Sequence, residues 1–302
     1  MSGSAVLFDA PGPRARRLHN LLTVVGVLLL LGLAWIIVGR LIEKDQLTAG
    51  RWDWILTGNA WTNYLLPGIF DTLRAAAIAI VLSMALALML AMARMSDLAP
   101  LRWAASIFVE FFRAVPVLIM MLFTFYFLSN QEFTPAGLNP LIGVIVGLTA
   151  YNSAVLCEVI RNGIASLPAG QREAGLSIGL SPPQVRRMIL IPQALTAMMP
   201  TLISQVVVIT KDSALGYLIL YPELVTMARQ LGSAQAATLP AYVVVAVLFI
   251  LINYSLGRVA EWVESRQRRR HRSAGGVVHA GTATLGTGLA GTDVHLEDVE
   301  TG

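Results

Sequence analysis

The sequence is poor in residues that crosslink a chain, bind metals or carry out catalysis. Its 302 residues include a single cysteine, Cys157, so no disulfide can form within the chain. A lone cysteine in an apolar stretch is usually a small core residue. The four histidines lie outside the long apolar stretches without metal-ligand spacing, and no combination of serine, histidine and aspartate indicates a catalytic triad. These absences predict no metal site and argue against a membrane enzyme.

Charged residues are also scarce, at 13% of the sequence, whereas 56% of residues are apolar and the mean hydropathy is +0.67. This composition is typical of a protein that crosses the membrane several times. Lysine occurs only as Lys44 and Lys211, and neither follows a glycine, so the phosphate-binding pattern G-x-x-x-x-G-K-[ST] is absent. We therefore expect no nucleotide cofactor on this chain. The excess of arginine is explained by membrane topology, so we predict no nucleic-acid binding.

Six apolar stretches are long enough to cross a lipid bilayer as helices. They cover residues 21–38, 69–93, 104–128, 140–160, 194–220 and 239–263. The sequence therefore predicts an all-α integral membrane protein with six transmembrane helices. Alternate connecting segments hold 14 and 4 lysines or arginines, and this bias places both termini in the cytoplasm of a cell-membrane protein.

The segments outside the apolar stretches differ in character. Residues 1–20 form a polar cytoplasmic segment, and the stretch that follows is too long for a signal peptide and lacks an Ala-x-Ala cleavage site. Residues 40–64 combine charges with tryptophans, which predicts a segment in the outer membrane interface rather than a carbohydrate or ligand site. Residues 266–302 begin with arginines, continue with glycine, threonine and alanine, and are expected to be a disordered cytoplasmic tail.

A polar interruption at residues 171–192 predicts a helical hairpin at the membrane surface. Helix-forming residues lead to Gly179, which can adopt the positive φ that ends a helix. Ser181 then supplies an N-cap, followed by two prolines and by Gln184 for a capping box. Helical spacing places four residues on one face of the second arm: Val185, Met188, Ile189 and Pro192. The alternative is an ordinary interfacial loop with a glycine turn.

The spacing in this 171–192 hairpin resembles the EAA loop of ABC importer permeases. That pattern is Glu-Ala-Ala, three residues, Gly, nine residues, Ile, one residue and Leu-Pro. Here Gly175 replaces the last alanine and Ile191 replaces the leucine. The resemblance implies that the first short helix docks into a groove on a cytoplasmic ATPase. The docking residues would be Glu173, Ala174, Gly175, Gly179, Ser181, Ile189 and Pro192.

Other motifs resemble the polar amino acid branch of these permeases. Glu110 and Arg113, followed by Pro116, look like the element E-x-x-R-G-T-P, and the five residues from Lys211 look like K-D-T-S-L. The resemblance covers about residues 65–265 and implies the five-helix core of a type I ABC importer, with residues 21–64 as an extra helix and outer loop. The N-terminal segment resembles that of actinobacterial glutamate permeases.

Four charges within the apolar stretches are candidates for the translocation path or its gate: Glu110, Arg113, Lys211 and Asp212. Glu110 and Arg113 lie three residues apart on one helix face and can pair, as can Glu158 and Arg161 at the end of the fourth apolar stretch. Pro116, three residues after Arg113, can bend the third stretch. Lys211 and Asp212 are adjacent and do not face each other, so they need partners on other helices or water. The alternative for all four is charge neutralisation that only fixes helix packing.

Together these features predict the permease subunit of an ATP-driven importer for polar amino acids, with glutamate or glutamine as the first candidates. The implied partners are an ATPase dimer that holds ATP and magnesium, a second permease chain, identical or homologous, and an extracytoplasmic amino acid-binding protein. ATP-driven closure would open the permease outward by alternating access. The rival is a secondary transporter that couples ions through Glu110, Lys211 and Asp212, but it leaves the pattern of residues 173–192 unexplained.

Overall fold

The computed structural model describes residues 12–131 and 134–275, and all regular structure in these ranges is helical. Five helices are long and apolar enough to cross a membrane, and one bent pair brings the number to six. The five cover Pro13–Glu43, Gly58–Arg94, Asn139–Ala165, Met199–Ile219 and Thr238–Trp262. The expected all-α membrane fold is therefore confirmed.

The third span is the bent pair. Helix α4 (Ala99–Ala114) and helix α5 (Val117–Gln131) meet at an angle of 100°, so residues 104–128, predicted as one span that Pro116 can bend, form parts of two separate helices. Pro116 cannot donate a backbone hydrogen bond, and its ring disfavours helical geometry at the residue before it. Val115 accordingly has extended backbone angles, with φ −84° and ψ 129°.

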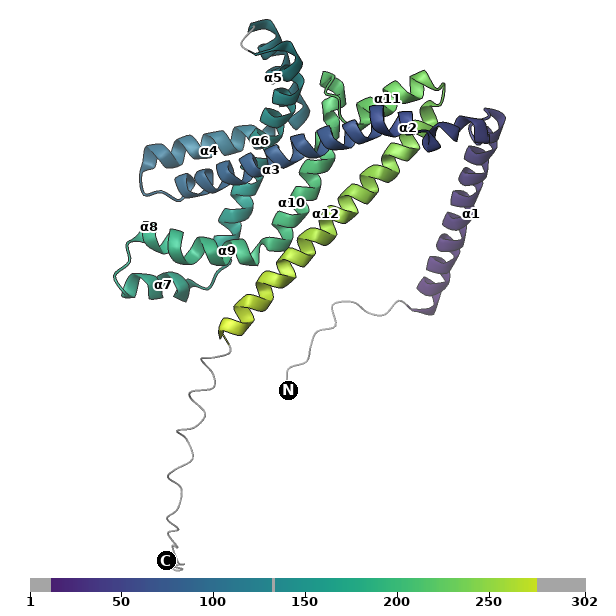
Figure 1. Ribbon diagram of the computed structural model, residues 1–302. Helices are drawn as coiled ribbons and strands as arrows, with labels where there is room; N and C mark the ends of the chain where they lie inside the picture. Colours follow the sequence, from purple (N-terminus) through teal and green to yellow (C-terminus); the bar gives the residue numbers. More distant parts are fainter. Residues whose placement is uncertain (1–11, 132–133, 276–302) are drawn as a thin grey trace, which may run out of the picture. The chain divides into compact units, whose positions relative to one another are not determined.

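One compact unit comprises the described residues within 73–221 and 249–275. Helix α6 (Asn139–Ala165) supplies much of its core, together with the end of α3 (Leu66–Arg94), the bent α4–α5 pair and α10 (Met199–Asp212). A 3-10 helix follows α10 at Ser213–Ile219. The first core cluster surrounds Cys157 and Ile160, and the second surrounds Met121 and Leu148. Figure 1 shows these helices in sequence colours.

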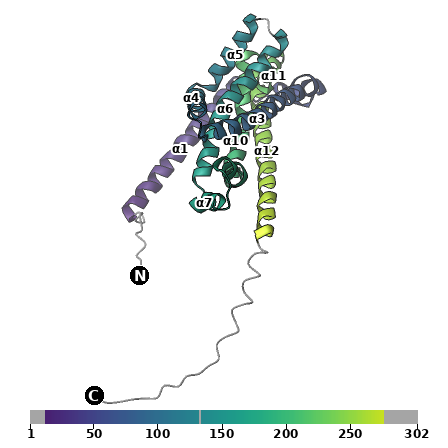
Figure 2. The ribbon, with the colours of Figure 1, turned by 90° about the vertical axis from the view of Figure 1, so that its left-hand side faces the viewer.

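The 171–192 hairpin belongs to this same unit. Its first arm is α7 (Ala169–Ser177). The second arm begins with α8 (Pro182–Val185), continues through a π-helical turn (Arg186–Leu190) and leads into α9 (Ile191–Ala197). In two views at right angles, the hairpin lies beyond the same end of α6 and α10 (Figures 1 and 2). The predicted helix, turn and helix are therefore present.

The second compact unit comprises, among the described residues, 12–72 and 222–248. Helix α1 (Pro13–Glu43) has no buried residue. The rest of the unit consists of two 3-10 helices, the short α2 (Gly58–Ala60), a π-helical turn (Trp61–Leu65), the first turns of α3, α11 (Leu224–Ala234) and the start of α12 (Thr238–Gly275). The Thr72 hydroxyl accepts a hydrogen bond of 3.1 Å from the backbone N–H of Leu224, which fixes the start of α11 on α3.

The sixth span ends at Trp262, close to its predicted end at residue 263, but the predicted start of the tail requires a correction. Helix α12 continues to Gly275, ten residues into the segment 266–302 that the sequence assigned to a disordered tail. Arginine and glutamine are good helix formers, and neither glycine nor proline interrupts residues 258–274. The remainder of the expected tail, residues 276–302, lies outside the described residues, as do residues 1–11 of the expected cytoplasmic segment.

Candidate functional site

Local backbone chemistry ends the first arm of the hairpin where the sequence predicts. Gly179 has a φ of 85°, the left-handed conformation that glycine tolerates best. Its N–H donates to the carbonyl of Leu176 at 3.0 Å, and the N–H of Leu180 donates to the carbonyl of Gly175 at 3.2 Å. This pair of bonds is a Schellman motif, which satisfies carbonyls that the end of α7 leaves without helical partners.

The second arm begins with the predicted cap. The side-chain Oε1 of Gln184 accepts hydrogen bonds from the backbone N–H of Ser181, at 2.8 Å, and from its hydroxyl, at 2.9 Å. One part of the predicted register is wrong, because Met188 and Pro192 are exposed while Leu190 and Ile191 are buried. The π-helical turn at residues 186–190 bonds i to i+5 and rotates the following residues relative to an α-helix.

The two arms pack closely at Gly175, the position where the family pattern usually has alanine. Gly175 is buried, and a Cβ atom there would lie 2.8 Å from Cδ1 of Ile189 and 2.9 Å from Cγ2 of Val185. The side chain of Gln193 adds a hydrogen bond of 2.9 Å to Oε1 of Gln171. The arms are therefore held against each other along their length.

The opposite face of α7 is free for a partner. Glu173 and Ala174 are exposed in the helix, and Ile178, its C-cap, has 76% of its surface accessible. Of the seven residues predicted to dock an ATPase, the structure thus places Glu173 and Ala174 on the outer face, Gly175 and Ile189 between the arms, and Gly179 and Ser181 in the turn. Pro192 lies exposed at the start of α9.

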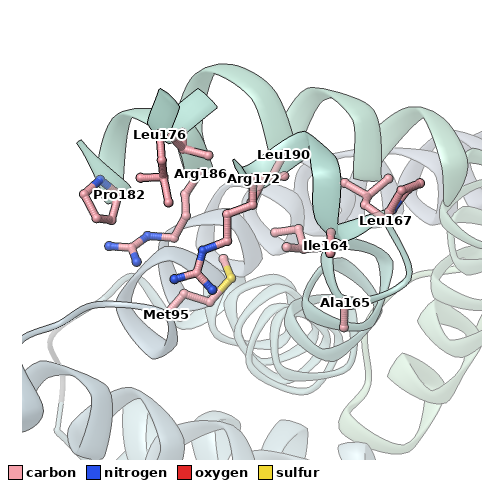
Figure 3. Close-up of a pocket in the computed structure, with 12 residues that line it drawn as sticks. Met95, Ile164, Ala165, Leu167, Arg172, Leu176, Pro182, Arg186 and Leu190 are labelled. Atoms are coloured by element: carbon pink, nitrogen blue, oxygen red, sulfur yellow. The ribbon is translucent and has the colours of Figure 1, made fainter. Parts of the chain in front are cut away.

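A cavity of about 500 Å³ lies between the hairpin and the end of α6. Arg172 and Arg186 reach into it from the two arms, alongside Met95 at the end of α3 (Figure 3). The rest of the wall is mostly apolar and includes Ile164 and Leu176. The cavity therefore combines a basic side with an apolar side.

A charged network links α3, α4 and α6 in the same unit. The carboxylate of Glu158 accepts a hydrogen bond from Arg94. It also lies 2.8 Å from Nη2 of Arg161 and 3.7 Å from Nη1 of Arg113. Oε1 of Glu110 lies 3.3 Å from Nη2 of Arg94. Glu110 and Arg113 thus each pair with another helix, whereas the sequence suggested that they pair with each other. The predicted pairing of Glu158 with Arg161 is present.

Lys211 and Asp212 lie at the end of α10, before the 3-10 helix. Lys211 is exposed and Asp212 is partly buried. Within residues 12–131 and 134–275, neither side chain has a hydrogen bond or ion pair to another helix, so the expected interhelical partners are not observed. The structure does not bring this pair into the network around Glu158.

Two residues that form ion pairs between elements of this unit were not predicted from the sequence. In the sequence, Arg94 was counted only among the basic residues that indicate membrane topology. In the structure its side chain is 12% exposed and joins Glu110 to Glu158. Asp97, in the turn between α3 and α4, was not singled out, yet it pairs with Arg186 of the hairpin. A weak signal for Arg94 was available, since an arginine at the end of a span can reach carboxylates on neighbouring helices. No pattern in the sequence indicates the contact of Asp97.

Comparison with known proteins identifies a matching family and similar permease proteins. The family described as binding-protein-dependent transport system inner membrane component matches residues 79–269. The glutamate transport system permease protein GluD of Corynebacterium glutamicum is 41% identical over 235 residues, covering 78% of this chain and 86% of that protein. The probable glutamine ABC transporter permease protein GlnP of Bacillus subtilis is 35% identical over 211 residues, covering 68% of this chain and 94% of that protein.

Solved structures show the same arrangement of helices. An amino acid ABC transporter crystallised with histidines matches with a TM-score of 0.62 and 25% identity, over 68% of this chain and 95% of that chain. The inward-facing MetNI methionine ABC transporter matches with a TM-score of 0.58 and 21% identity, over 70% of this chain and 99% of that chain. The matched family region contains the whole 171–192 hairpin and excludes α1.

Proposed function

The chain belongs to the family of binding-protein-dependent transport system inner membrane components, and we propose that it imports glutamate or glutamine as the permease subunit of an ATP-driven transporter. Family membership makes it a multi-pass inner-membrane protein and the permease component of an ABC transporter. ATP hydrolysis in such a transporter lies in a separate subunit, so the nucleotide is not a cofactor of this chain. A secondary transporter that works without an ATPase is no longer a candidate.

The substrate proposal rests on the named relatives. The proteins with 41% and 35% identity are named as permeases for glutamate and for glutamine. Both substrates are polar amino acids that carry a carboxylate and an ammonium group, so a path for them needs charged or polar side chains. Glu110, Arg113, Lys211 and Asp212 are our candidates for that path or its gate. Glu110 and Arg113 are well placed for this role because their side chains are 64% and 42% exposed despite their ion pairs.

The 171–192 hairpin is the proposed docking element for the ATPase. The observation that carries this proposal is the division of α7 into two faces. One face packs on the second arm through Gly175, and the other exposes Glu173 and Ala174, while Ile178 is exposed directly after the helix. Since both arms are capped and packed against each other, the hairpin can move as a rigid body when a partner displaces it. Closure of the ATPases would then open the permease outward.

The proposed assembly contains two ATPase chains, a second permease chain, identical or homologous, and an extracytoplasmic amino acid-binding protein. Family membership supports an ATPase and a binding protein as partners. The arginine distribution supports a topology with both termini and the hairpin in the cytoplasm. In this topology the hairpin faces the ATPases.

Reconstitution into proteoliposomes tests the function. The chain, its ATPase, its companion permease if one is required and its binding protein should accumulate labelled glutamate or glutamine only when ATP is present on the ATPase side. Competition by unlabelled glutamate, glutamine, aspartate and histidine then ranks the substrates. ATP-dependent uptake that neither glutamate nor glutamine inhibits would overturn the substrate assignment and leave the permease assignment intact.

Gly179→Val tests the docking proposal. A Cβ atom at residue 179 would touch nothing within 4 Å, so the substitution strains only the left-handed backbone, by about 1–2 kcal/mol. We expect the chain to reach the membrane but to lose its ATPase during purification or to hydrolyse ATP without uptake. Gly170→Val is the matched control, because Gly170 also has no neighbour within 4 Å but lacks a positive φ. Normal uptake by the Gly179 variant would contradict the docking role.

A further inference from the structure

An ion pair joins the hairpin to the turn between α3 and α4. Nη2 of Arg186 lies 3.2 Å from Oδ2 of Asp97, although the two residues are 89 positions apart in the sequence. Among the described residues, it is the only ion pair between the hairpin and another helix or turn. The Arg186 side chain is 19% exposed and that of Asp97 is 72% exposed. The pair therefore has one end packed in the hairpin and one end at the surface.

The turn that carries Asp97 is internally braced. The Ser96 hydroxyl accepts a hydrogen bond of 3.2 Å from the backbone N–H of Leu98. The Ser96 carbonyl accepts another, also of 3.2 Å, from Nη1 of the Arg102 side chain. These bonds fix the turn to the first turn of α4. The hydrogen bond from Arg186 lowers the pKa of Asp97 below its ordinary value, and the charge of Arg186 acts in the same direction. Asp97 therefore stays ionised at neutral pH, and its carboxylate lies on a turn that hydrogen bonds hold in place.

Open space lies on both sides of the pair. Arg186 lines the cavity of about 500 Å³ that also contains Met95 and Arg172. Arg186 and Asp97 both line a second hollow of about 640 Å³, which Met92 and Pro183 also border. Apolar packing does not fill these spaces, so the ion pair bridges a gap between the second arm of the hairpin and the turn. Such a contact can open without rupturing a packed core.

We propose that Asp97 and Arg186 form a latch that positions the hairpin against the α3–α4 turn and that opens when the ATPases close. The inference rests on the proposed role of the hairpin as the ATPase-docking element. The exposed end makes the pair weak and sensitive to salt, which suits a contact that must break in every transport cycle. The latch keeps the hairpin from moving in the absence of substrate, so that hydrolysis remains coupled to import. Arg186 and Asp97 are thus positioning residues that act through the hairpin.

Neutralising either partner should loosen this coupling. We expect Asp97→Asn and Arg186→Gln to raise ATP hydrolysis in the absence of binding protein by about two- to fivefold, the size of effect that one exposed ion pair has on an equilibrium. Uptake per ATP hydrolysed should fall accordingly. The charge-swapped double variant, Asp97→Arg with Arg186→Asp, should move both values back toward wild type. High salt should raise basal hydrolysis of the wild type and leave the single variants unchanged.

Arg187→Gln is the matched control for loss of charge in the hairpin. Arg187 is the next residue along, is exposed, and has no ion pair among the described residues. The latch is refuted if Arg186→Gln behaves like Arg187→Gln, or if the charge swap gives no recovery. A purely structural role predicts lower yield of the complex, with hydrolysis per complex unchanged, and this result would also refute the latch.

Crosslinking tests the movement directly. A short bis-maleimide should join Leu98→Cys to Pro183→Cys in the nucleotide-free complex, with the buried Cys157 replaced by alanine, because both positions border the same hollow as the ion pair and leave the pair intact. Trapping the ATPases closed with ATP and vanadate should reduce this crosslink, and equal crosslinking in both states would overturn the proposal. Failure of the proposed function is a separate result, because then no ATPase would copurify with the wild-type chain and no hydrolysis could be assigned to the complex.

Discussion

The carboxylate at the centre of the charged network allows a quantitative test of what stabilises the α3–α4–α6 packing. Glu158→Gln removes the charge and keeps the shape. The Glu158 side chain is 11% exposed and that of Arg94 is 12% exposed, so this pair is nearly buried. Arg161 and Arg113 are 46% and 42% exposed, so water can solvate them when Glu158 loses its charge. The main penalty therefore falls on Arg94.

Removing one partner of a buried ion pair costs about 3–5 kcal/mol, because the other charge is left buried without compensation. Glutamine retains one acceptor oxygen, and Glu110 remains 3.3 Å from Arg94, so we expect the lower end of this range, about 3 kcal/mol. Glu110→Gln is the matched control in the same network. Its side chain is 64% exposed, and the expected cost is below about 1 kcal/mol.

The chain contains its own reporter for this measurement. Cys157 is the only cysteine, is fully buried and adjoins Glu158 in α6. A maleimide dye that fluoresces on reaction with a thiol will label Cys157 only when the surrounding helices separate. Heating the detergent-solubilised protein with this dye should give a clearly lower midpoint for Glu158→Gln and a nearly unchanged midpoint for Glu110→Gln. Equal midpoints for Glu158→Gln and wild type would refute the buried-pair argument.

Three further changes have defined outcomes. Lys211→Gln and Asp212→Asn should each reduce uptake strongly at normal membrane levels if the pair serves the transport path, and normal uptake by both would exclude that role. Burial raises the pKa of Glu223 from 4.5 to about 7, so the folded chain holds a proton that the unfolded chain releases. Thermal stability should therefore fall as pH rises from 4.5 to 7, by up to roughly 3 kcal/mol, and Glu223→Gln should flatten this dependence in a melting series. Gly175→Leu should overpack the contact of the two arms by about 1–3 kcal/mol and reduce ATPase copurification more than Gly175→Ala, and equal effects would show that the contact adapts freely.

The turn and caps of the hairpin were predictable because they depend on neighbours in the sequence. Only a residue without a side chain adopts the φ of Gly179 at little cost, and the cap joins Ser181 to Gln184 three residues away. Such signals do not require knowledge of the rest of the fold. The same reasoning located the break near Pro116, although it could not supply the angle of 100°, which is set by the packing of α5 on α6.

The exposed face of the second arm was not predictable in the same way. A regular α-helix would have buried Met188 beside Val185, but the π-helical turn leaves Met188 64% exposed. The partners of the charged residues were equally hidden, because arginine side chains span the distance between helices. Glu110 therefore pairs with Arg94 rather than with Arg113, its neighbour along the helix. Interhelical geometry decides such choices, and spacing along the chain cannot report it.

The departure of this hairpin from the family pattern has a structural explanation in the space between its arms. Gly175 stands where the pattern has alanine, and the opposite arm carries the branched side chains of Val185 and Ile189 within 3 Å of the position that a Cβ atom would occupy. The volume omitted on α7 is thus filled from the second arm, so the contact remains closely packed. The exchange takes place on the buried face and leaves Glu173 and Ala174 exposed on the other. The surface that we propose for ATPase docking can therefore be preserved while the interior of the hairpin varies, provided that the volumes of the two arms change together.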